Sequence, residues 1–248
     1  MKVVFHEDFY QVYTGDPAAA TGRMEAVVEI IEPHVEFVSA EPVFRQHITA
    51  VHTAMHIQHV ENQGLYEIAA LSAGGAVQAA QIGLIEPCFS LIRPPGHHAS
   101  ADSAWGFCYF NNMAVALETL RGQKKIESAC VLDIDLHFGD GTVNILGNRN
   151  WVTVINVDAH TRSHYLKEVE EAMKNCRVDL IGISAGVDNH FEDWGGLLYT
   201  EDYEEIGYRV RSAAVRRGGG CFAILEGGYN HKVLGENVLA LIEGMAKR

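Results

Sequence analysis

Short runs of apolar and β-branched residues alternate along the chain with longer stretches whose apolar residues recur at helical spacing. The predicted strands cover residues 3–5, 36–39, 88–92, 129–136, 151–157, 179–184 and 221–225, and the predicted helices cover 22–32, 48–60, 65–84, 111–121, 165–175, 201–217 and 231–246. The strands are apolar on both faces, which is typical of a mostly parallel sheet covered by helices. The pattern predicts one α/β domain over residues 1–248, with three α/β/α layers.

Four of the predicted strands end in loops that are rich in glycine and in polar residues. RPPGHH follows the strand at 88–92, DIDLHFGDG completes the strand at 129–136, SAGVDNHFEDWGG follows 179–184, and EGGYN follows 221–225. In parallel sheets, ligands bind beyond the carboxyl ends of the strands, where loops from separated strands converge. We therefore expect the four loops to form a single active site.

The segment Asp133-Ile-Asp135-Leu-His137 places two carboxylates and an imidazole at alternate positions. In an extended strand these three side chains share one face. Two neighbouring carboxylates need a counter-charge, which a divalent metal provides. Asp188 in SAGVD would complete an Asp/His/Asp set that leaves positions open for water and substrate. The alternative is a capped strand end that faces solvent.

Two adjacent histidines, His97 and His98, follow the turn-forming residues PPG. Neighbouring imidazoles repel each other when both are protonated, so a functional pair needs unequal pKa values. Asp133 and Asp140 are the expected partners, and different carboxylate surroundings would separate the two pKa values. One imidazole could then accept a proton from a water molecule that attacks a carbonyl group. The alternative is a surface loop without a role.

The sequence EGGYN adds a phenol to this set of residues. The two glycines allow the chain to turn tightly after the strand, so Tyr229 can direct its hydroxyl group toward a carbonyl oxygen as an oxyanion donor. The alternative is a tyrosine that serves only in packing.

Composition and charge exclude several classes of protein. The formal net charge of −13 argues against direct binding of nucleic acid and agrees with an amine ligand. The five cysteines include no C-x-x-C pair, which argues against disulfides and a thiolate zinc site. Neither a run of about 18 apolar residues nor a signal-like start occurs, so we expect a cytoplasmic protein without membrane contact. The oligomeric state is left open, with a homodimer as one option.

Five motifs occur in a fixed order: RPPGHHA, WGFCYFNNMAVA, VLDIDLHFGDGT, SAGVDNH and LEGGYN. They resemble the histone deacetylase, acetylpolyamine amidohydrolase and acetoin-utilisation family over about residues 85–232. LEGGYN is more similar to the class II and prokaryotic members than to class I. The resemblance implies an arginase/deacetylase-like fold and a metal-dependent removal of acetyl from an acetylated amine. Acetyl-lysine in a protein, an acetylpolyamine and a small acylated metabolite all fit as substrates.

The resemblance also implies the metal ligands. Asp135, His137 and Asp188 match the family's ligands of a catalytic zinc, or ferrous iron in the cell. In this family, oxygen atoms at Asp133, Asp135 and His137 also help to hold a structural potassium ion.

Other roles follow from matching positions. His97 and His98 match the tandem histidines, with His98 the better candidate for the general base. The remaining matches are the carboxylates behind these histidines (Asp133 and Asp140), the tyrosine that polarises the acetyl carbonyl (Tyr229), and two residues of the substrate tunnel (Gly106, through its backbone carbonyl, and Phe107).

The chain departs from the family pattern after Val157. Members usually carry a long glycine-rich loop here, whereas only about thirty residues separate Val157 from Asp188, and a predicted helix fills much of that distance. One wall of the tunnel is expected to be missing or rebuilt, with residues 163–165 as the candidate replacement. Trp194 stands where a proline is more usual.

Two other functions compete with a deacetylase. An arginase-like ureohydrolase is suggested by NVDAHT at 156–161, but Thr161 and Arg162 stand where that motif should continue with another aspartate. Asp158 and His160 are therefore expected near the ion site or in an ordinary polar loop. The second alternative is a non-catalytic module that keeps the pocket in order to bind acetylated ligands.

Overall fold

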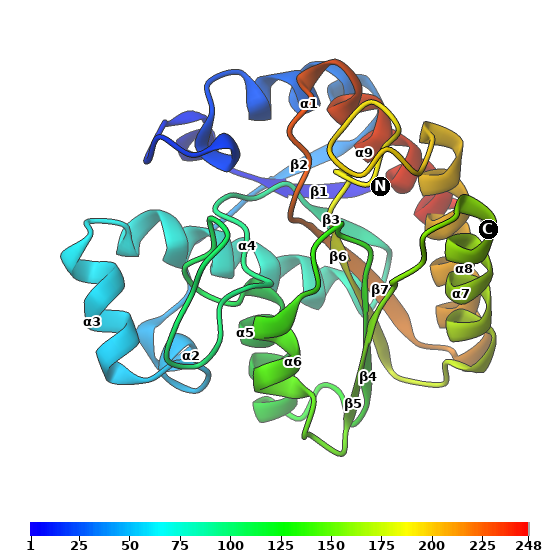
Figure 1. The fold of residues 1–248 in the computed structure, drawn as a ribbon. Coiled ribbons are helices and arrows are strands. Elements are labelled where there is room, and N and C mark those ends of the chain that lie inside the picture. Colours follow the sequence, from blue (N-terminus) through cyan, green and yellow to red (C-terminus); the bar gives the residue numbers. More distant parts are fainter. Residues whose placement is uncertain (248) are drawn as a thin grey trace.

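The computed structural model describes residues 1–247 as seven strands of one parallel sheet, covered by helices (Figure 1). The strands are β1 (Lys2–Phe5), β2 (Glu36–Ser39), β3 (Cys88–Ser90), β4 (Ala129–Asp133), β5 (Val152–Asn156), β6 (Leu180–Ala185) and β7 (Gly220–Leu225). They lie in the order β2-β1-β3-β7-β6-β4-β5, and every neighbouring pair is parallel. The parallel sheet is confirmed, and every predicted strand has a counterpart, although β3 and β4 end earlier than predicted.

The helices form a layer on each face of the sheet. They are α1 (Arg23–Ile31), α2 (Arg45–Thr49), α3 (Ala54–Asn62), α4 (Tyr66–Gly83), α5 (Asn112–Gly122), α6 (Asp140–Leu146), α7 (Arg162–Asn175), α8 (Thr200–Arg217) and α9 (His231–Ala246). Figure 1 shows α4, α5 and α6 on one side, and α1, α7, α8 and α9 on the other. The three predicted layers are therefore confirmed.

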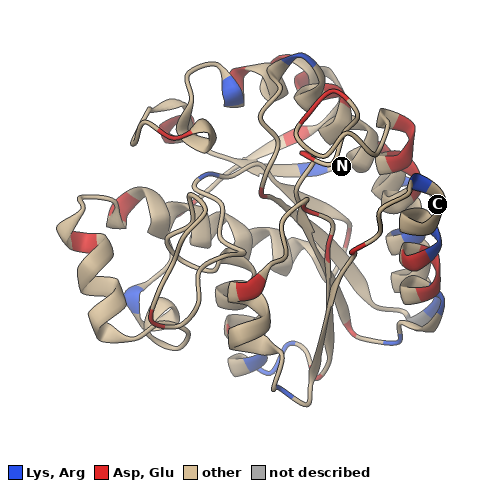
Figure 2. Cartoon of the chain, in the orientation of Figure 1, with Lys and Arg blue, Asp and Glu red and all other residues tan. Residues whose placement is uncertain are grey.

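The sheet is the centre of the hydrophobic core. All residues of β6 and β7 are buried, including Ile183 and Phe222. Burying a large apolar side chain of this kind contributes about 1.5–3 kcal/mol to the free energy of folding. Figure 2 shows that charged residues lie mainly on the outer helices and loops. None of the helices described within residues 1–247 meets the length and apolarity needed to cross a bilayer.

The helix predicted at 48–60 is wrong, because two helices occupy this region. α2 ends at Thr49, and α3 begins at Ala54 after an N-cap at Thr53, whose side chain accepts the His56 backbone N–H. His52 lies in the segment between the two helices. Its Nδ1–H donates to the Ser100 carbonyl at 2.9 Å, and its Nε2 accepts the Asn111 N–H at 2.9 Å.

This bonding requires a neutral His52 and predicts acid sensitivity. Burial, followed by the nearby His56, lowers the pKa of His52 to about 4 from its ordinary 6.5. Between these pH values the unfolded chain binds a proton that the folded protein does not, so the free energy of unfolding falls as the pH is lowered. The expected loss is on the order of 3 kcal/mol.

Chemical denaturation at pH 7.5 and pH 4.5 measures this loss. His52→Gln should reduce the pH dependence, whereas His164→Gln, which changes a largely exposed side chain on α7, should not. Equal pH slopes for the wild-type protein and His52→Gln would contradict the prediction.

Candidate active site

A pocket lies beyond the carboxyl ends of β3, β7, β6 and β4, which are neighbours in the sheet. It has a volume of about 110 Å³. Loops after all four strands contribute to its lining, which consists of Pro95, His97, His98, Trp105, Gly106, Phe107, His137, Trp194, Gly227 and Tyr229. The four polar loops thus meet at one place, as the sequence predicts.

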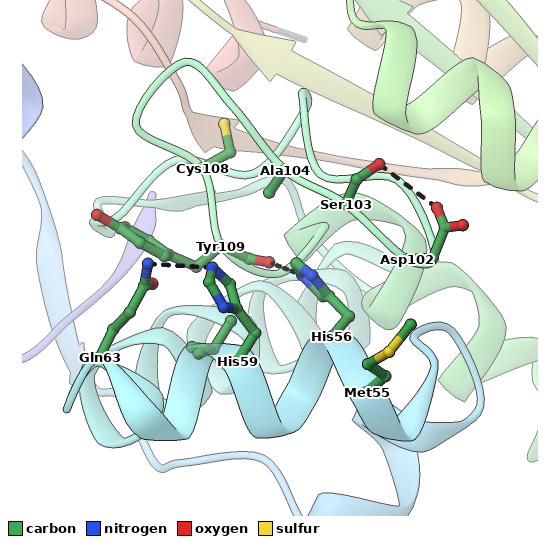
Figure 3. Close-up of a pocket in the computed structure, with 10 residues that line it drawn as sticks. Met55, His56, His59, Gln63, Asp102, Ser103, Ala104, Cys108 and Tyr109 are labelled. Atoms are coloured by element: carbon green, nitrogen blue, oxygen red, sulfur yellow. Dashed lines mark hydrogen bonds between the residues drawn. The ribbon is translucent and has the colours of Figure 1, made fainter.

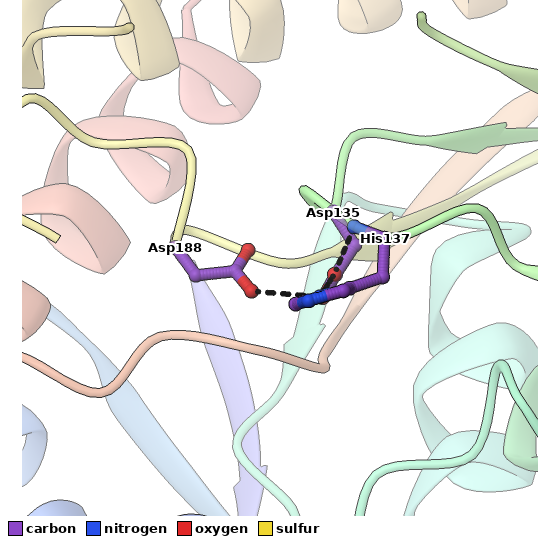
Figure 4. A group of neighbouring side chains, drawn as sticks. All are labelled: Asp135, His137 and Asp188. Atoms are coloured by element: carbon purple, nitrogen blue, oxygen red, sulfur yellow. Dashed lines mark hydrogen bonds and ion pairs between the residues drawn. The ribbon is translucent and has the colours of Figure 1, made fainter. Parts of the chain in front are cut away.

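Three potential metal ligands lie together, and one of them, His137, lines this pocket (Figure 4). One ligand atom from each of Asp135, His137 and Asp188 lies within 4.8 Å of the others. His137 Nδ1 is 3.3 Å from Asp135 Oδ1 and 3.4 Å from Asp188 Oδ2. Both carboxylates are buried, whereas the His137 side chain is 38% exposed. Of the three side chains, His137 is therefore the one that is exposed to the pocket.

The expected common face of the D-x-D-x-H segment is wrong. β4 ends at Asp133, and Asp135 and His137 belong to the loop that follows. The Asp135 N–H donates to Asp133 Oδ1 at 3.1 Å, which turns the chain and ends the alternation of a strand. Leu136, whose side chain would lie on the opposite face of such a strand, is 37% exposed. Asp133 consequently faces His97 instead of joining the three-residue group.

The charges of the group suit a cation. The neighbouring carboxylates of Asp135 and Asp188 raise the pKa of His137 to about 10. Burial, and then repulsion from Asp135, raises the pKa of Asp188 to about 6. Asp188 Oδ2 is buried and accepts no well-aligned hydrogen bond from the described residues. A divalent cation would replace the imidazole proton and satisfy this oxygen, so the residues fit a metal.

Two glycines allow the backbone to approach these carboxylates. A Cβ atom at Gly186 would lie 2.0 Å from Asp135 Oδ2, and one at Gly227 would lie 2.6 Å from both Asp135 Oδ2 and Asp188 Oδ2. The Gly227 N–H also donates to Asp135 Oδ2 at 2.8 Å. Any side chain at either position would displace a carboxylate, so the glycines of SAGVD and EGGYN are required by the site.

The two adjacent histidines contact different carboxylates. His97 Nδ1 is 3.1 Å from Asp133 Oδ2, and His98 Nδ1 is 2.8 Å from Asp140 Oδ1. These are the partners expected from the sequence. The two rings lie with their centroids 4.0 Å apart, and His97 Nε2 is 3.8 Å from Asp135 Oδ1. Each carboxylate fixes one imidazole through Nδ1, which leaves Nε2 for contacts in the pocket.

The surroundings push the two pKa values apart. Burial by itself lowers the pKa of His97, but the carboxylates of Asp135 and Asp133 raise it well above its usual value. Burial, followed by the charge of His97, lowers the pKa of His98 to about 4. These shifts favour the charged form of His97 and the neutral form of His98.

Trp105 contacts both members of the His98–Asp140 pair. Its ring stacks on His98 with centroids 3.8 Å apart, and its indole N–H donates to Asp140 Oδ2 at 2.9 Å. Burial by itself raises the pKa of Asp140, but the hydrogen bonds from Trp105 and His98 hold that pKa below its usual value. Asp140 thus stays charged while it orients His98.

Aromatic rings form the other walls. Gly106 and Phe107 both have left-handed backbone angles, with φ of 59° and 69°. This conformation is unusual for a bulky residue and places Phe107 against the pocket. The Phe107 and Tyr229 rings are 6.0 Å apart, edge to face. Burial raises the pKa of Tyr229, so its phenol keeps the proton that a donor needs.

Residues 163–165 do not rebuild the missing wall, contrary to expectation. They lie in the first turn of α7 and are absent from the described lining of the pocket. Tyr165 is 1% exposed, and its hydroxyl donates to the Ile134 carbonyl at 2.9 Å. Asp158 and His160 are exposed loop residues that line a neighbouring hollow of about 340 Å³.

Two buried residues outside the predicted set, Glu226 and Arg23, form hydrogen bonds to the backbone of the pocket loops. Glu226 Oε2 accepts the N–H of Gly96 at 2.7 Å and of His97 at 3.2 Å. Arg23 donates to the carbonyls of Gly228 at 2.8 Å and Glu226 at 2.7 Å. A carboxylate at the end of the apolar run CFAIL was a usable signal for Glu226. Arg23 gave none, because it begins an ordinary amphipathic helix.

A larger hollow of about 360 Å³ lies between α3 and the segment 102–109 (Figure 3). Its lining includes His56, His59 and Asp102. His56 Nε2 is 2.7 Å from the Tyr109 carbonyl and is thereby occupied. Within the described residues, the potential metal ligands that come together include His137, which lines the smaller pocket. We therefore place the candidate active site there.

Comparison with known proteins agrees with this geometry. The model of the histone deacetylase domain matches the chain over residues 18–166 and over 156–245. The chain belongs to the histone deacetylase family. The solved HD domain of HDA15 superimposes with a TM-score of 0.85 at 21% identity, covering 99% of this chain and 89% of that one.

Similar curated proteins carry deacetylase and amidohydrolase names. A probable deacetylase of Methanothermobacter thermautotrophicus is 27% identical over 302 residues, covering 98% of this chain and 90% of the relative. A histone deacetylase-like amidohydrolase of Pseudomonas aeruginosa is 26% identical, with 90% and 74% covered. An acetylpolyamine amidohydrolase of Mycoplana ramosa is 29% identical, with 74% and 64% covered.

The matches also agree with a segment after β5 that is shorter in this chain than in its relatives. The 302 aligned positions of the first relative exceed the 248 residues of this family member, so that relative has residues without a counterpart here. The two matches to the family model meet at residues 156–166, directly after β5. This position agrees with the short segment after Val157 noted in the sequence.

Proposed function

We propose that this deacetylase family member hydrolyses the amide bond of an acetylated amine and that it depends on a divalent metal ion. The single observation that carries this proposal is the meeting of Asp135, His137 and Asp188 with two differently charged histidines in one pocket. The deacetylase and amidohydrolase names of the relatives support it.

Asp135, His137 and Asp188 would hold the ion, zinc or ferrous iron. When bound, such an ion polarises the amide carbonyl and makes water a stronger nucleophile at neutral pH. Oxygen atoms at Asp133, Asp135 and His137 would help to hold a structural potassium ion, as the family resemblance implies.

The chain's own residues would move the protons and orient the substrate. His98, neutral at pH 7, accepts the proton of the attacking water, and Asp140 keeps its imidazole oriented. Tyr229 donates its hydroxyl hydrogen to the carbonyl oxygen as charge develops there. The protonated His97, held by Asp133, gives a proton to the leaving amine. Gly106 would accept the substrate amide N–H with its backbone carbonyl.

The experiment is amine release from an acetyl-lysine peptide, acetylspermidine and acetylputrescine, using protein stripped of metal and reloaded with zinc or iron. We expect metal-dependent turnover that Asp135→Ala and His98→Ala both abolish. His164→Ala changes a histidine on the outer face of α7 and should leave turnover intact. The best substrate then assigns the acylated amine.

A binding module without catalysis is the second candidate, and the short segment after Val157 favours it. This candidate predicts tight binding of the metal and of acetylated amines with no release of amine from any substrate in the panel. That outcome would reject the proposed hydrolysis.

A further inference from the structure

Trp194 lies against both groups that would act on the substrate carbonyl. Its ring stacks on Tyr229 with centroids 3.9 Å apart and an angle of 23° between the planes. It also meets His137 edge to face at 6.1 Å. The side chain is well exposed, at 52%, and lines the pocket. A carbonyl placed between His137 and Tyr229 would therefore have one of its substituents beside the indole.

The loop that carries Trp194 is fixed to the loop that carries Tyr229. Asp193 Oδ2 accepts the N–H of Tyr229 and the N–H of Asn230, both at 2.8 Å. The Asn230 side-chain amide donates to the Glu192 carbonyl at 2.7 Å. The position of the indole relative to the phenol is thus set by three hydrogen bonds around Trp194, and stacking does not act alone.

Trp194 also forms one wall of the pocket. Phe107 approaches Tyr229 from the loop after β3, and Trp194 approaches it from the loop after β6. Residues 163–165 contribute nothing to this lining. The pocket has a volume of about 110 Å³. Since a water molecule takes about 30 Å³ in the liquid, this space holds only a small group of heavy atoms.

We propose that Trp194 is a specificity-determining residue that limits the acyl group to acetyl and holds the Tyr229 ring in place. This inference rests on the proposed deacylation and adds to it the acyl selectivity and the residue responsible. A butyryl group is longer than acetyl by two methylenes and would collide with the indole.

The test compares acetyl, propionyl and butyryl forms of one lysine peptide with the wild-type protein, Trp194→Ala and Trp194→Phe, all loaded with zinc. For Trp194→Ala we expect the butyryl-to-acetyl ratio of kcat/KM to rise at least tenfold, since pocket contacts discriminate one methylene by about 10–200-fold. The kcat for the acetyl peptide should fall, because Tyr229 loses the ring on which it stacks. Trp194→Phe keeps an aromatic ring and should give intermediate values.

Phe191→Ala is the matched control. Phe191 is on the same loop, is 56% exposed, and stacks on Tyr199 at 5.2 Å instead of on Tyr229. Its ratio should equal that of the wild-type protein. An unchanged ratio in Trp194→Ala, or an equal rise in Phe191→Ala, would overturn the inference while leaving the deacylation itself intact.

Calorimetric binding of N-acetyl and N-butyryl butylamine gives a second readout. If the wild-type protein hydrolyses no acyl peptide, the proposed function fails, and the affinities alone decide the inference. The butyryl compound should then gain affinity relative to the acetyl compound in Trp194→Ala, and equal relative affinities in the two proteins would reject the role of Trp194.

Discussion

Replacing Asp188 by asparagine is expected to abolish both tight zinc binding and turnover while the fold stays intact. Asp188 Oδ1 accepts the Leu136 N–H at 3.0 Å, and an asparagine oxygen can keep this bond. What is lost is the negative charge that balances the cation. Zinc at one hundred times its dissociation constant stabilises a native protein by about 2.7 kcal/mol. For a chain of this size that corresponds to a rise in Tm of roughly 5–10 °C.

Thermal unfolding with and without zinc measures the effect of Asp188→Asn. The wild-type Tm should rise with zinc, and the variant Tm should not. In the metal-free state we expect the variant to be at least as stable as the wild-type protein. The reason is that burial and Asp135 already raise the pKa of Asp188 to about 6, so its ionisation at higher pH destabilises the fold. A full zinc response in the variant would rule out Asp188 as a ligand.

Replacing Tyr229 by phenylalanine is expected to lower kcat by about 10²–10³-fold, the usual loss when one oxyanion donor is removed. The change deletes only the hydroxyl group. The ring can keep its stacking on Trp194 and its contact with Phe107. KM and the zinc-dependent rise in Tm should therefore change little, because the hydroxyl acts when charge develops on the carbonyl oxygen.

Steady-state kinetics on the best substrate, beside Tyr208→Phe, tests this prediction. Tyr208 is on α8, is 43% exposed and is absent from the described pocket lining, so its change should leave kcat unaffected. A loss below threefold in Tyr229→Phe would assign the phenol to packing.

The two histidines show how adjacent imidazoles in one pocket obtain opposite pKa shifts. His97 faces two buried carboxylates, Asp133 and Asp135, and is held protonated. Burial, followed by the charge of His97, lowers the pKa of His98, and the half-exposed Asp140 opposes this shift only in part. The difference comes from burial and neighbouring charge, which adjacent positions in a sequence do not reveal by themselves.

Local patterns were sufficient for the sheet and for the polar loops. Strands such as β6 and β7 are buried on both faces, so their continuous apolar residues mark them without knowledge of their partners. The glycines at 186 and 227 stand next to the residues that they serve, so SAGVD and EGGYN could be recognised as units. The pairing of His98 with Asp140 was also expected from the motifs.

Other features depend on contacts between segments far apart in the chain. α6 was not predicted, because Asp140–Leu146 contains glycine and β-branched residues with low helix propensity. It forms against the histidine loop, where the Thr142 N–H donates to the His97 carbonyl. The interrupted helix at 48–60 likewise reflects bonds from His52 to Ser100 and Asn111.

The sequence by itself therefore determined the alternation of strands and helices, the family, and the side chains that gather at the strand ends, since each of these is encoded within a few neighbouring residues. The tertiary structure decided that β4 ends at Asp133, so the alternation of a strand does not extend to His137, and that Trp194, but not residues 163–165, lines the pocket. It also decided that Glu226 and Arg23 hold the loops. These outcomes depend on where a turn directs a side chain and on which distant segment lies beside it, and periodicity carries no information about either.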